Sequence, residues 1–239
     1  MKETNTKEMQ GEIKIKALLY GKPKTGKTFS ALSLNPETTL ILSAESGILP
    51  IKLSGKNYTV WEIKTFADMV ESYKQLLLPE NQKRFKVIFI DSLTEINELA
   101  KDQILKSSGP GKDKEMMTLQ DYGLLLTHMI GLVRKYRDLP YHVIFTALEE
   151  NYKDEQTGAV SFVCSLNGKF AVNIAGYFDE VFRMITKEED GAINRYFFTA
   201  KIEKTITGDR SGALETFEQP SWKIVFEKIF KKFKVKEEK

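Results

Sequence analysis

The hydrophobic positions of the chain form short continuous runs that alternate with segments of helical periodicity. The apolar runs of strand length are residues 13–20, 39–43, 58–63, 86–91 and 142–147. The helical segments are residues 65–78, 92–106 and 118–137, with one more that follows residue 28 and ends near Asn35. Continuous apolar runs are typical of strands buried on both faces, and strands that alternate with helices form parallel sheets. This pattern predicts an α/β fold with a mostly parallel sheet flanked by helices.

A different pattern follows in the last third of the chain, where the segments are shorter and more polar. We expect a turn-rich stretch at 149–161, a short helix at 168–176, strands at 179–185 and 195–202, a mobile loop at 203–219 and a terminal helix from Pro220. The two strands are joined by KEEDGAIN, which predicts a C-terminal β-hairpin. The chain therefore divides into a disordered tail (1–12), a core (13–217) and a C-terminal helix with a basic tail (218–239).

The composition narrows the class of protein only a little. The chain has 239 residues, of which 41% are hydrophobic and 29% charged, as in ordinary soluble α/β proteins. No apolar run approaches the ~18–20 residues of a membrane span, and the polar start MKETNTKEMQGE resembles neither a signal nor a transit peptide. The lone Cys164 cannot form an internal disulfide, as is usual in a reducing compartment. We expect a cytoplasmic protein without a membrane partner, and its net charge of +3 permits nucleic-acid contact without indicating it.

A phosphate-binding loop is the strongest motif in the sequence. The stretch GKPKTGKT, residues 21–28, matches G-x-x-x-x-G-K-[ST] and lies between a predicted strand and a predicted helix. The backbone N–H groups of such a loop surround the β-phosphate, while Lys27 reaches the β- and γ-oxygens and Thr28 binds Mg²⁺. The predicted nucleotide-binding residues are Gly21, Lys22, Pro23, Lys24, Thr25, Gly26, Lys27, Thr28 and Phe29. The predicted cofactors are ATP and Mg²⁺.

Two acidic residues at strand ends complete the predicted site. Asp91 ends the apolar run VIFID and is the candidate Mg²⁺ ligand beside Thr28. It is followed by Ser92, whereas many ATPases and helicases place their catalytic glutamate there. Hydrolysis needs a group that positions the attacking water. The candidate is Glu45, because ligands bind at the carboxyl ends of strands in open α/β sheets. The alternative interpretation of Glu45 is a solvated loop residue, and the alternative candidate for the catalytic role is Glu95.

Two classes of phosphate-loop protein are disfavoured by missing motifs. A GTPase carries an N-K-x-D motif after a later strand, and this sequence has none. A small-molecule kinase usually has an arginine-rich lid, whereas residues 107–115 contain lysines and no arginine.

The motifs GKPKTGKT, ILSAESG and VIFIDSLTEI, in this order, resemble the RecA-like recombinase core. In that core the catalytic glutamate follows the second strand, and a serine follows the magnesium aspartate. The chain is most similar to phage-encoded RecA-like ATPases of the Sak type, the AAA_24-like phage nucleotide-binding proteins. These proteins often show DYG entering a long helix, here Asp121-Tyr122-Gly123. The resemblance covers about residues 13–212 and predicts a RecA-like P-loop NTPase core.

The resemblance implies a DNA-dependent ATPase that binds single-stranded DNA and forms a filament or ring of its own copies. Such a protein promotes annealing or strand pairing in phage homologous recombination within the bacterial host cell, and a phage single-strand DNA-binding protein is a further partner. By position, residues 107–117 and 149–167 correspond to the loops that face DNA. The candidate DNA-binding residues are Lys106, Lys112, Lys114, Tyr152 and Lys153, with Asn151 and Phe162 beside them. Two ordinary solvated loops are the alternative interpretation.

Basic residues near the end of such a core reach the γ-phosphate held by the neighbouring subunit. The candidates here are Lys201, Lys204 and Arg210, and for each the alternative is a surface charge. The sequence departs from the family at the end of the strand 142–147. RecA-like cores usually have a polar residue there that senses the γ-phosphate, whereas this chain has Leu148. Thr146 and Glu149 are the candidates to replace it.

A second hypothesis uses the same nucleotide site for a different purpose. In this alternative the protein is an ATP-dependent oligomeric scaffold or assembly protein, in which ATP fixes the oligomer and DNA does not stimulate turnover. Both hypotheses require the phosphate loop, so the sequence alone leaves them open.

Overall fold

The computed structural model describes residues 13–45, 47–106, 115–202 and 204–237. The strands are β1 (Lys16–Gly21), β2 (Thr39–Ser43), β3 (Thr59–Glu62), β4 (Val87–Asp91), β5 (His142–Lys153), β6 (Val160–Cys164), β7 (Glu180–Glu189), β8 (Ala192–Phe198), β9 (Gly208–Asp209) and β10 (Phe217–Glu218). The central sheet has the order β10-β8-β7-β1-β5-β4-β2-β3, with β6 paired to β5 and β9 to β7. The pairs from β3 to β7 along this order are parallel, whereas β8 and β10 are antiparallel additions.

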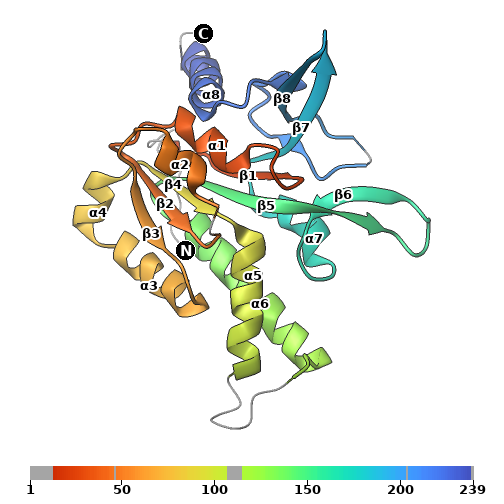
Figure 1. Cartoon of the computed structure of the whole chain (residues 1–239). Helices are drawn as coiled ribbons and strands as arrows, with labels where there is room; N and C mark the ends of the chain where they lie inside the picture. Colours follow the sequence, from red (N-terminus) through yellow and green to blue (C-terminus); the bar gives the residue numbers. More distant parts are fainter. Residues whose placement is uncertain (1–12, 46, 107–114, 203, 238–239) are drawn as a thin grey trace.

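Helices cover both faces of this sheet (Figure 1). The helices are α1 (Lys27–Ser30), α2 (Leu49–Leu53), α3 (Phe66–Leu76), α4 (Pro79–Arg84), α5 (Leu93–Lys106), α6 (Leu119–Arg137), α7 (Phe170–Asn173) and α8 (Trp222–Glu237), with 3-10 turns at Ala31–Ser33 and Ile174–Tyr177. Alternate residues of β1 face opposite layers, since Leu18 and Tyr20 pack with α3, α5 and α6 while Ala17 and Leu19 pack with α2 and α8. The prediction of a mostly parallel sheet flanked by helices, with a C-terminal hairpin and helix, is confirmed.

Local sequence signals fix where the two best-capped helices begin. Thr65 caps α3 and Thr118 caps α6, and each accepts a hydrogen bond from the backbone N–H three residues later. In turn, the Asp68 and Asp121 carboxylates accept hydrogen bonds from the backbone N–H groups of the cap residues, which completes a capping box in both cases. The predicted starts at residues 65 and 118 are therefore confirmed.

The structure corrects the prediction for residues 149–161. Instead of a polar, turn-rich stretch, these residues extend β5 to Lys153 and form most of an antiparallel hairpin with β6. The side chain of Asp154 makes the turn by accepting hydrogen bonds from the backbone N–H groups of Gln156 and Thr157 (2.9 and 2.8 Å). The hairpin projects beyond the sheet, so its polar residues stay exposed and do not show the apolar pattern of a buried strand.

The C-terminal hairpin is confirmed and is longer than predicted. The strands β7 and β8 pair from Arg183 with Phe198 to Glu189 with Ala192. Asp190 and Gly191, at φ 52° and 75°, form the two-residue turn, as expected of Asp-Gly between antiparallel strands. The hairpin extends past the end of β1 on the side of the phosphate loop, where Arg195 of β8 lies close to Gly26.

Residues 204–219 differ from the mobile loop predicted from sequence. The short strands β9 and β10 attach this segment to β7 and β8. The Asp209 side chain accepts hydrogen bonds from the backbone N–H groups of Gly212 and Leu214 (2.8 and 2.9 Å) and from the Ser211 hydroxyl (2.5 Å). Two short strand pairings and one carboxylate thus organise the segment.

The terminal helix α8 packs onto the phosphate-loop helix. The Trp222 side chain is fully buried against Phe182 and Phe197, with ring centroids 5.7 and 5.0 Å away. Its indole N–H donates to the Ser30 hydroxyl (3.0 Å), and its backbone N–H donates to the Ser33 hydroxyl (2.9 Å). The C-terminal helix is therefore tied by hydrogen bonds to α1 and to the 3-10 turn that follows it.

Candidate nucleotide-binding site

The phosphate loop connects the end of β1 to the start of α1, as the sequence predicts. Gly21 is required by close packing, because a Cβ there would lie 2.8 Å from the carbonyl oxygen of Met184 on β7. Gly26 has φ 106°, which an L side chain rarely adopts. The Thr25 hydroxyl donates to the Lys22 carbonyl (2.8 Å) and closes the loop from within. The loop is therefore shaped by the chain itself.

Lys27 is buried inside this loop, with 7% of its surface exposed. Its ammonium group donates to the carbonyl oxygens of Gly21 and Lys22, both at 2.9 Å. Burial lowers the pKa of Lys27, while the nearby carboxylates of Glu45 and Asp91 raise it in part. A phosphate chain in the loop would supply the compensating negative charge, so the geometry fits an anionic ligand.

Asp91, at the end of β4, is hydrogen-bonded to both α1 and β5. The Thr28 hydroxyl of α1 donates to one carboxylate oxygen (2.7 Å), and the Thr146 hydroxyl of β5 donates to the other (2.5 Å). Burial raises the pKa of Asp91, although both hydroxyls and Lys27 oppose this effect. Mg²⁺ takes oxygen ligands and keeps several positions for phosphate oxygens and water. The oxygens of Thr28 and Asp91 fit that requirement.

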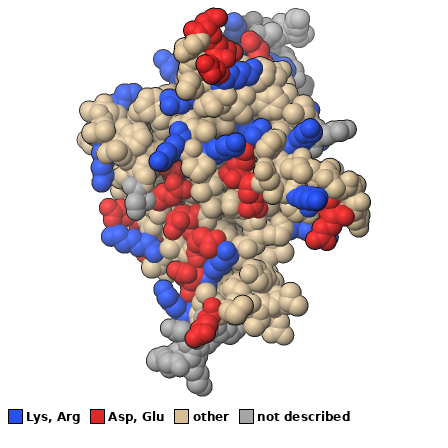
Figure 2. Space-filling model, turned by 45° about the vertical axis from the view of Figure 1, so that its right-hand side comes forward, with Lys and Arg blue, Asp and Glu red and all other residues tan. Residues whose placement is uncertain are grey.

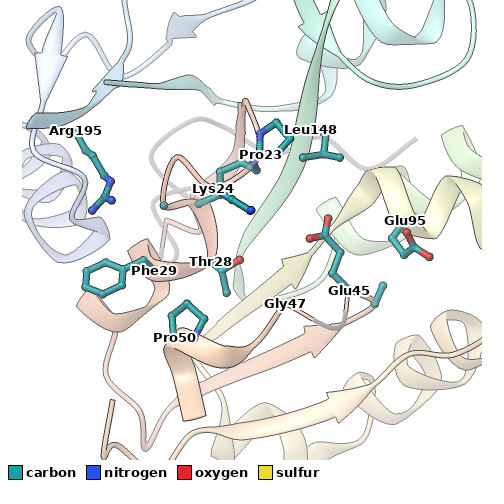
Figure 3. Close-up of a pocket in the computed structure, with 13 residues that line it drawn as sticks. Pro23, Lys24, Thr28, Phe29, Glu45, Gly47, Pro50, Glu95, Leu148 and Arg195 are labelled. Atoms are coloured by element: carbon teal, nitrogen blue, oxygen red, sulfur yellow. The ribbon is translucent and has the colours of Figure 1, made fainter. Parts of the chain in front are cut away.

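Glu45 lies on the neighbouring loop, held to the end of β4. The backbone N–H groups of Ala44 and Glu45 donate to the Asp91 carbonyl (2.8 and 3.2 Å), and the Ser92 hydroxyl donates to the Glu45 carboxylate. Figure 3 shows the Glu45 carboxylate pointing into the pocket between Thr28 and Glu95. The alternative, Glu95, also lines the pocket, and burial raises its pKa with help from the charge of Glu45. The choice of Glu45 over Glu95 stays a prediction.

These groups surround one pocket of about 710 Å³. Its walls are Pro23, Lys24, Gly26, Lys27, Thr28, Phe29, Ala44, Glu45, Gly47, Pro50, Glu95, Leu148 and Arg195. Leu148 lies in the wall, and its backbone N–H donates to the Thr94 hydroxyl (2.9 Å). Glu149 points elsewhere, because Arg183 forms a two-pronged ion pair with it (2.6 and 2.9 Å). Of the two candidates to replace the sensor residue, Thr146 touches the site through Asp91.

Arg195 is a charged pocket residue that sequence reasoning missed. It comes from β8, far along the chain, and its side chain lies against Gly26, with the Cδ atom 3.2 Å from where a Cβ would stand. In sequence, Arg195 is one more charge on a hairpin strand. Its position depends on how the hairpin folds back over the loop, and no local signal carries that information.

The candidate trans-acting residues lie outside this pocket. Arg210 donates to Asp179 (3.4 Å) and to the Gly176 carbonyl (3.3 Å), at the end of β1 opposite to the phosphate loop. Lys201 and Lys204 border a second cavity of about 760 Å³ beside β6, where the backbone N–H of Phe162 donates to the Lys204 carbonyl (2.8 Å). Their action on a neighbouring subunit stays a prediction.

The candidate DNA-binding residues are spread over two places. Lys106 is exposed at the end of α5, whereas Lys112 and Lys114 lie outside the described residues. On the β5–β6 hairpin, Lys153 is exposed, while Tyr152 is partly buried against the core. The Phe162 ring is covered by the Arg183 guanidinium, 3.7 Å from its centre. Figure 2 shows acidic and basic side chains mixed over the visible face, without a broad area of one sign.

The described residues contain no helix with the length and apolar character needed to span a bilayer.

Comparison with known proteins gives a family match over most of the chain. The sequence model AAA_24, described as an AAA domain, matches residues 13–211. No curated protein matches the chain. Among solved structures, the chain is similar to the crystal structure of a KaiC-like protein from hyperthermophilic archaea, Pyrococcus horikoshii OT3. That similarity has 13% sequence identity and a TM-score of 0.43, and covers 80% of each chain.

Proposed function

The chain belongs to the AAA_24 family of P-loop ATPases, and on this premise we propose that it is a RecA-like protein that hydrolyses Mg²⁺-ATP and acts on single-stranded DNA. The observation that carries the ATPase part is the largely buried cluster of Lys27, Thr28, Asp91 and Thr146 at the carboxyl end of the parallel strands. The resemblance to Sak-type proteins supports the finer proposal of annealing or strand pairing in phage homologous recombination.

Each residue of the cluster has a distinct task in the proposed reaction. The loop N–H groups and Lys27 hold the β- and γ-phosphates, while Thr28 and Asp91 hold the metal ion. Mg²⁺ supplies charge neutralisation on the phosphate oxygens when bound. Glu45 accepts a hydrogen bond from the attacking water and directs it at the γ-phosphate. Ser92, which donates to Glu45, fixes the orientation of that carboxylate.

The DNA part of the proposal rests on lysines around the β5–β6 hairpin. Lys201 and Lys204 lie beside β6, through the bridge between Phe162 and Thr205, and Lys153 lies on the same hairpin. Lysines contact phosphates independently of sequence, and such contacts weaken as salt concentration rises. We propose that these three lysines bind the backbone of single-stranded DNA, in an assembly of several copies of the chain. For Lys201 and Lys204 this proposal is a second role beside the predicted contact with a neighbouring subunit's γ-phosphate. A phage single-strand DNA-binding protein stays a predicted partner.

Steady-state ATP hydrolysis with and without single-stranded DNA tests the proposal, at low and moderate salt. Wild type is compared with Lys27→Ala and Glu45→Gln, with Glu95→Gln as the matched carboxylate control. We expect DNA to stimulate turnover, and both Lys27→Ala and Glu45→Gln to abolish it, while Glu95→Gln retains it. Full turnover in Glu45→Gln would remove the proposed role of that residue.

The double variant Lys201→Ala/Lys204→Ala tests the proposed DNA surface. We expect it to bind single-stranded DNA at least about tenfold more weakly and to show a reduced salt dependence. The matched control is Lys223→Ala, which removes an exposed lysine of α8 that pairs with Glu227 at 4.0 Å. Equal DNA binding by both variants would contradict the assignment of this surface.

A specific observation favours the scaffold as the second candidate function. Tyr152 and Phe162, the aromatic residues offered for base stacking, are engaged by the core and by Arg183. If turnover is the same with and without DNA, and light scattering shows that ATP alone increases the particle mass, the scaffold replaces the recombinase proposal. Retained ATP binding with no change of mass contradicts the scaffold.

A further inference from the structure

The pocket has two chemically different sides. Figure 3 shows Glu45 and Glu95 on one side of Thr28, and Phe29 and Arg195 on the other. The acidic side adjoins Asp91 and the ammonium group of Lys27, where a γ-phosphate and its metal ion would lie. A nucleoside triphosphate is elongated, so its base extends away from the γ-phosphate. Phe29 and Arg195 are therefore on the side that the base would reach.

The Phe29 ring is exposed and does not pack into the hydrophobic core. It follows Thr28 directly, 55% of its surface is exposed, and it lines the pocket. The neighbouring residues of α1 behave differently, since Lys27 and Ser30 are buried. An exposed aromatic ring beside a phosphate-binding loop offers a flat surface on which a base can stack.

Arg195 reaches the same place from the C-terminal hairpin. Its Cδ, Nε and Cζ atoms lie 3.2, 3.4 and 3.9 Å from the position of a Cβ on Gly26. Within the described ranges, no carboxylate forms an ion pair with it and no carbonyl accepts from its guanidinium. By contrast, Arg183 on the neighbouring strand is fully engaged by Glu149 and Phe162. An arginine that is planar, charged and without a protein partner at a ligand pocket is available to a ligand.

We propose that Phe29 and Arg195 form a clamp for the nucleobase of the bound triphosphate, with the base lying against the Phe29 ring and the Arg195 guanidinium plane. This inference rests on the proposed function of the phosphate loop and assigns a base subsite within the same pocket. The clamp binds the base through its flat face, so it favours the larger purine rings over pyrimidines.

The clamp also ties the hairpin to nucleotide binding. Arg195 lies on β8, four residues from the turn at Gly191, and β7 is hydrogen-bonded to β1 along its first half. A base that packs against Arg195 would thus contact both the phosphate loop after β1 and the β7–β8 hairpin. Gly26 is the close-approach point, since a side chain there would displace Arg195.

Comparing two ligands separates the base subsite from the phosphate subsite. Calorimetric titrations with Mg²⁺-ATP and with Mg²⁺-tripolyphosphate, which has no base, are made on wild type, Phe29→Ala, Arg195→Ala and Arg195→Lys. The control Ile193→Ala removes an exposed side chain from the same hairpin strand. Thermal unfolding of each variant confirms that it is folded.

We expect Arg195→Ala and Phe29→Ala to weaken ATP binding about tenfold and to leave tripolyphosphate binding unchanged. Arg195→Lys keeps the charge but loses the plane, so it should lose most of the same affinity. Ile193→Ala should bind both ligands as wild type does. Equal weakening of ATP and tripolyphosphate by Arg195→Ala would make it a phosphate contact and overturn the clamp, as would unchanged ATP affinity in both alanine variants. If wild type binds neither ligand, the nucleotide site itself fails and the clamp fails with it.

Discussion

Two buried lysines stand at opposite ends of the central strand β1, and their immediate contacts are nearly the same. Lys16, which is 8% exposed, donates to the carbonyl oxygens of Leu139 and Tyr141 (2.6 and 2.5 Å). Lys27, which is 7% exposed, donates to two carbonyl oxygens of its own loop. Burial lowers the pKa of both, that of Lys16 to about 8. By burial and hydrogen bonding alone, the two cannot be told apart.

Their surroundings distinguish them. Lys27 lines the pocket together with Glu45, and Asp91 holds the strand end beside it. The Lys16 ammonium group is enclosed by the connection between α6 and β5. Among nearby charges, Asp179 raises the Lys16 pKa the most, and the Asp179 carboxylate accepts a hydrogen bond from the Lys16 backbone N–H (3.3 Å). A perturbed pKa marks a functional site only when the group also faces space for a ligand. We therefore infer a functional role for Lys27, which lines the pocket, and a structural role for Lys16.

Among the substitutions considered, Lys27→Ala at the phosphate-loop end of β1 should reduce ATP turnover the most. Removing the ammonium group deletes the charge that stabilises the phosphates in the transition state, so turnover should fall by about 10²–10³-fold. Stability should change little, because the loop loses a charge that burial already disfavours. Rates of phosphate release and the midpoint of urea unfolding test the two statements separately. Unchanged turnover would assign Lys27 to structure as well.

Glu180→Gln, near the Lys16 end of β1, should change how the free energy of unfolding depends on pH. Burial raises the pKa of Glu180 to about 9, and the nearby charge of Asp209 adds to this effect. Between its unfolded pKa of 4.5 and about 9, the folded protein binds one proton more than the unfolded chain. The free energy of unfolding should therefore fall as pH rises, by at most about 1.4 kcal/mol for each pH unit.

Urea unfolding of wild type and Glu180→Gln between pH 5 and pH 8 measures this term. The upper limit avoids the opposite contribution of Lys16, whose stability term grows above pH 8. Glutamine keeps the size of the side chain and cannot titrate, so the difference between the two curves belongs to Glu180. Parallel curves would mean that Glu180 is ionised in the folded protein, against the expected direction of its pKa.

Thr146→Val should affect the phosphate-loop site less than Lys27→Ala does. The fully buried hydroxyl donates to Asp91 (2.5 Å), and valine keeps the shape while leaving one carboxylate oxygen without its partner. We expect a loss of about 1–2 kcal/mol in stability and a several-fold higher Mg²⁺ requirement for ATP hydrolysis. The matched control is Thr39→Val on β2, whose buried hydroxyl has no hydrogen-bond partner among the described residues. An identical Mg²⁺ dependence in both variants would separate Thr146 from the metal site.

The contrast between local and distant interactions also explains what the sequence could predict. The apolar runs of β1, β2 and β4, the capped starts of α3 and α6, and the loop from Gly21 to Thr28 are each specified by neighbouring residues. Glu45 and Asp91 were predicted to lie together because parallel strands end at one edge of the sheet, and the backbone N–H of Glu45 does donate to the Asp91 carbonyl there.

Features that depend on distant partners were missed for the same physical reason. The extension of β5 exists because β6 pairs with it, and residues 204–219 are held by β7, β8 and the side chain of Asp209. Arg195 reaches Gly26 only when the β7–β8 hairpin has folded over the loop. None of these contacts leaves a periodic or short-range signal in the sequence.

Lys16→Met should have the smallest effect and completes the comparison. A straight apolar side chain fills the same space, and replacing a buried charge by an apolar group is often close to neutral. ATP turnover should stay within about twofold of wild type. Because the folded pKa of about 8 lies below the ordinary lysine pKa of 10.5, the unfolded chain binds more protons between these values, and wild-type stability should rise with pH there. Unfolding measurements from pH 8 to pH 10.5 should show a shallower rise in Lys16→Met. A large loss of turnover in this variant would contradict the assignment, because it would connect the far end of β1 to the chemistry at the phosphate loop.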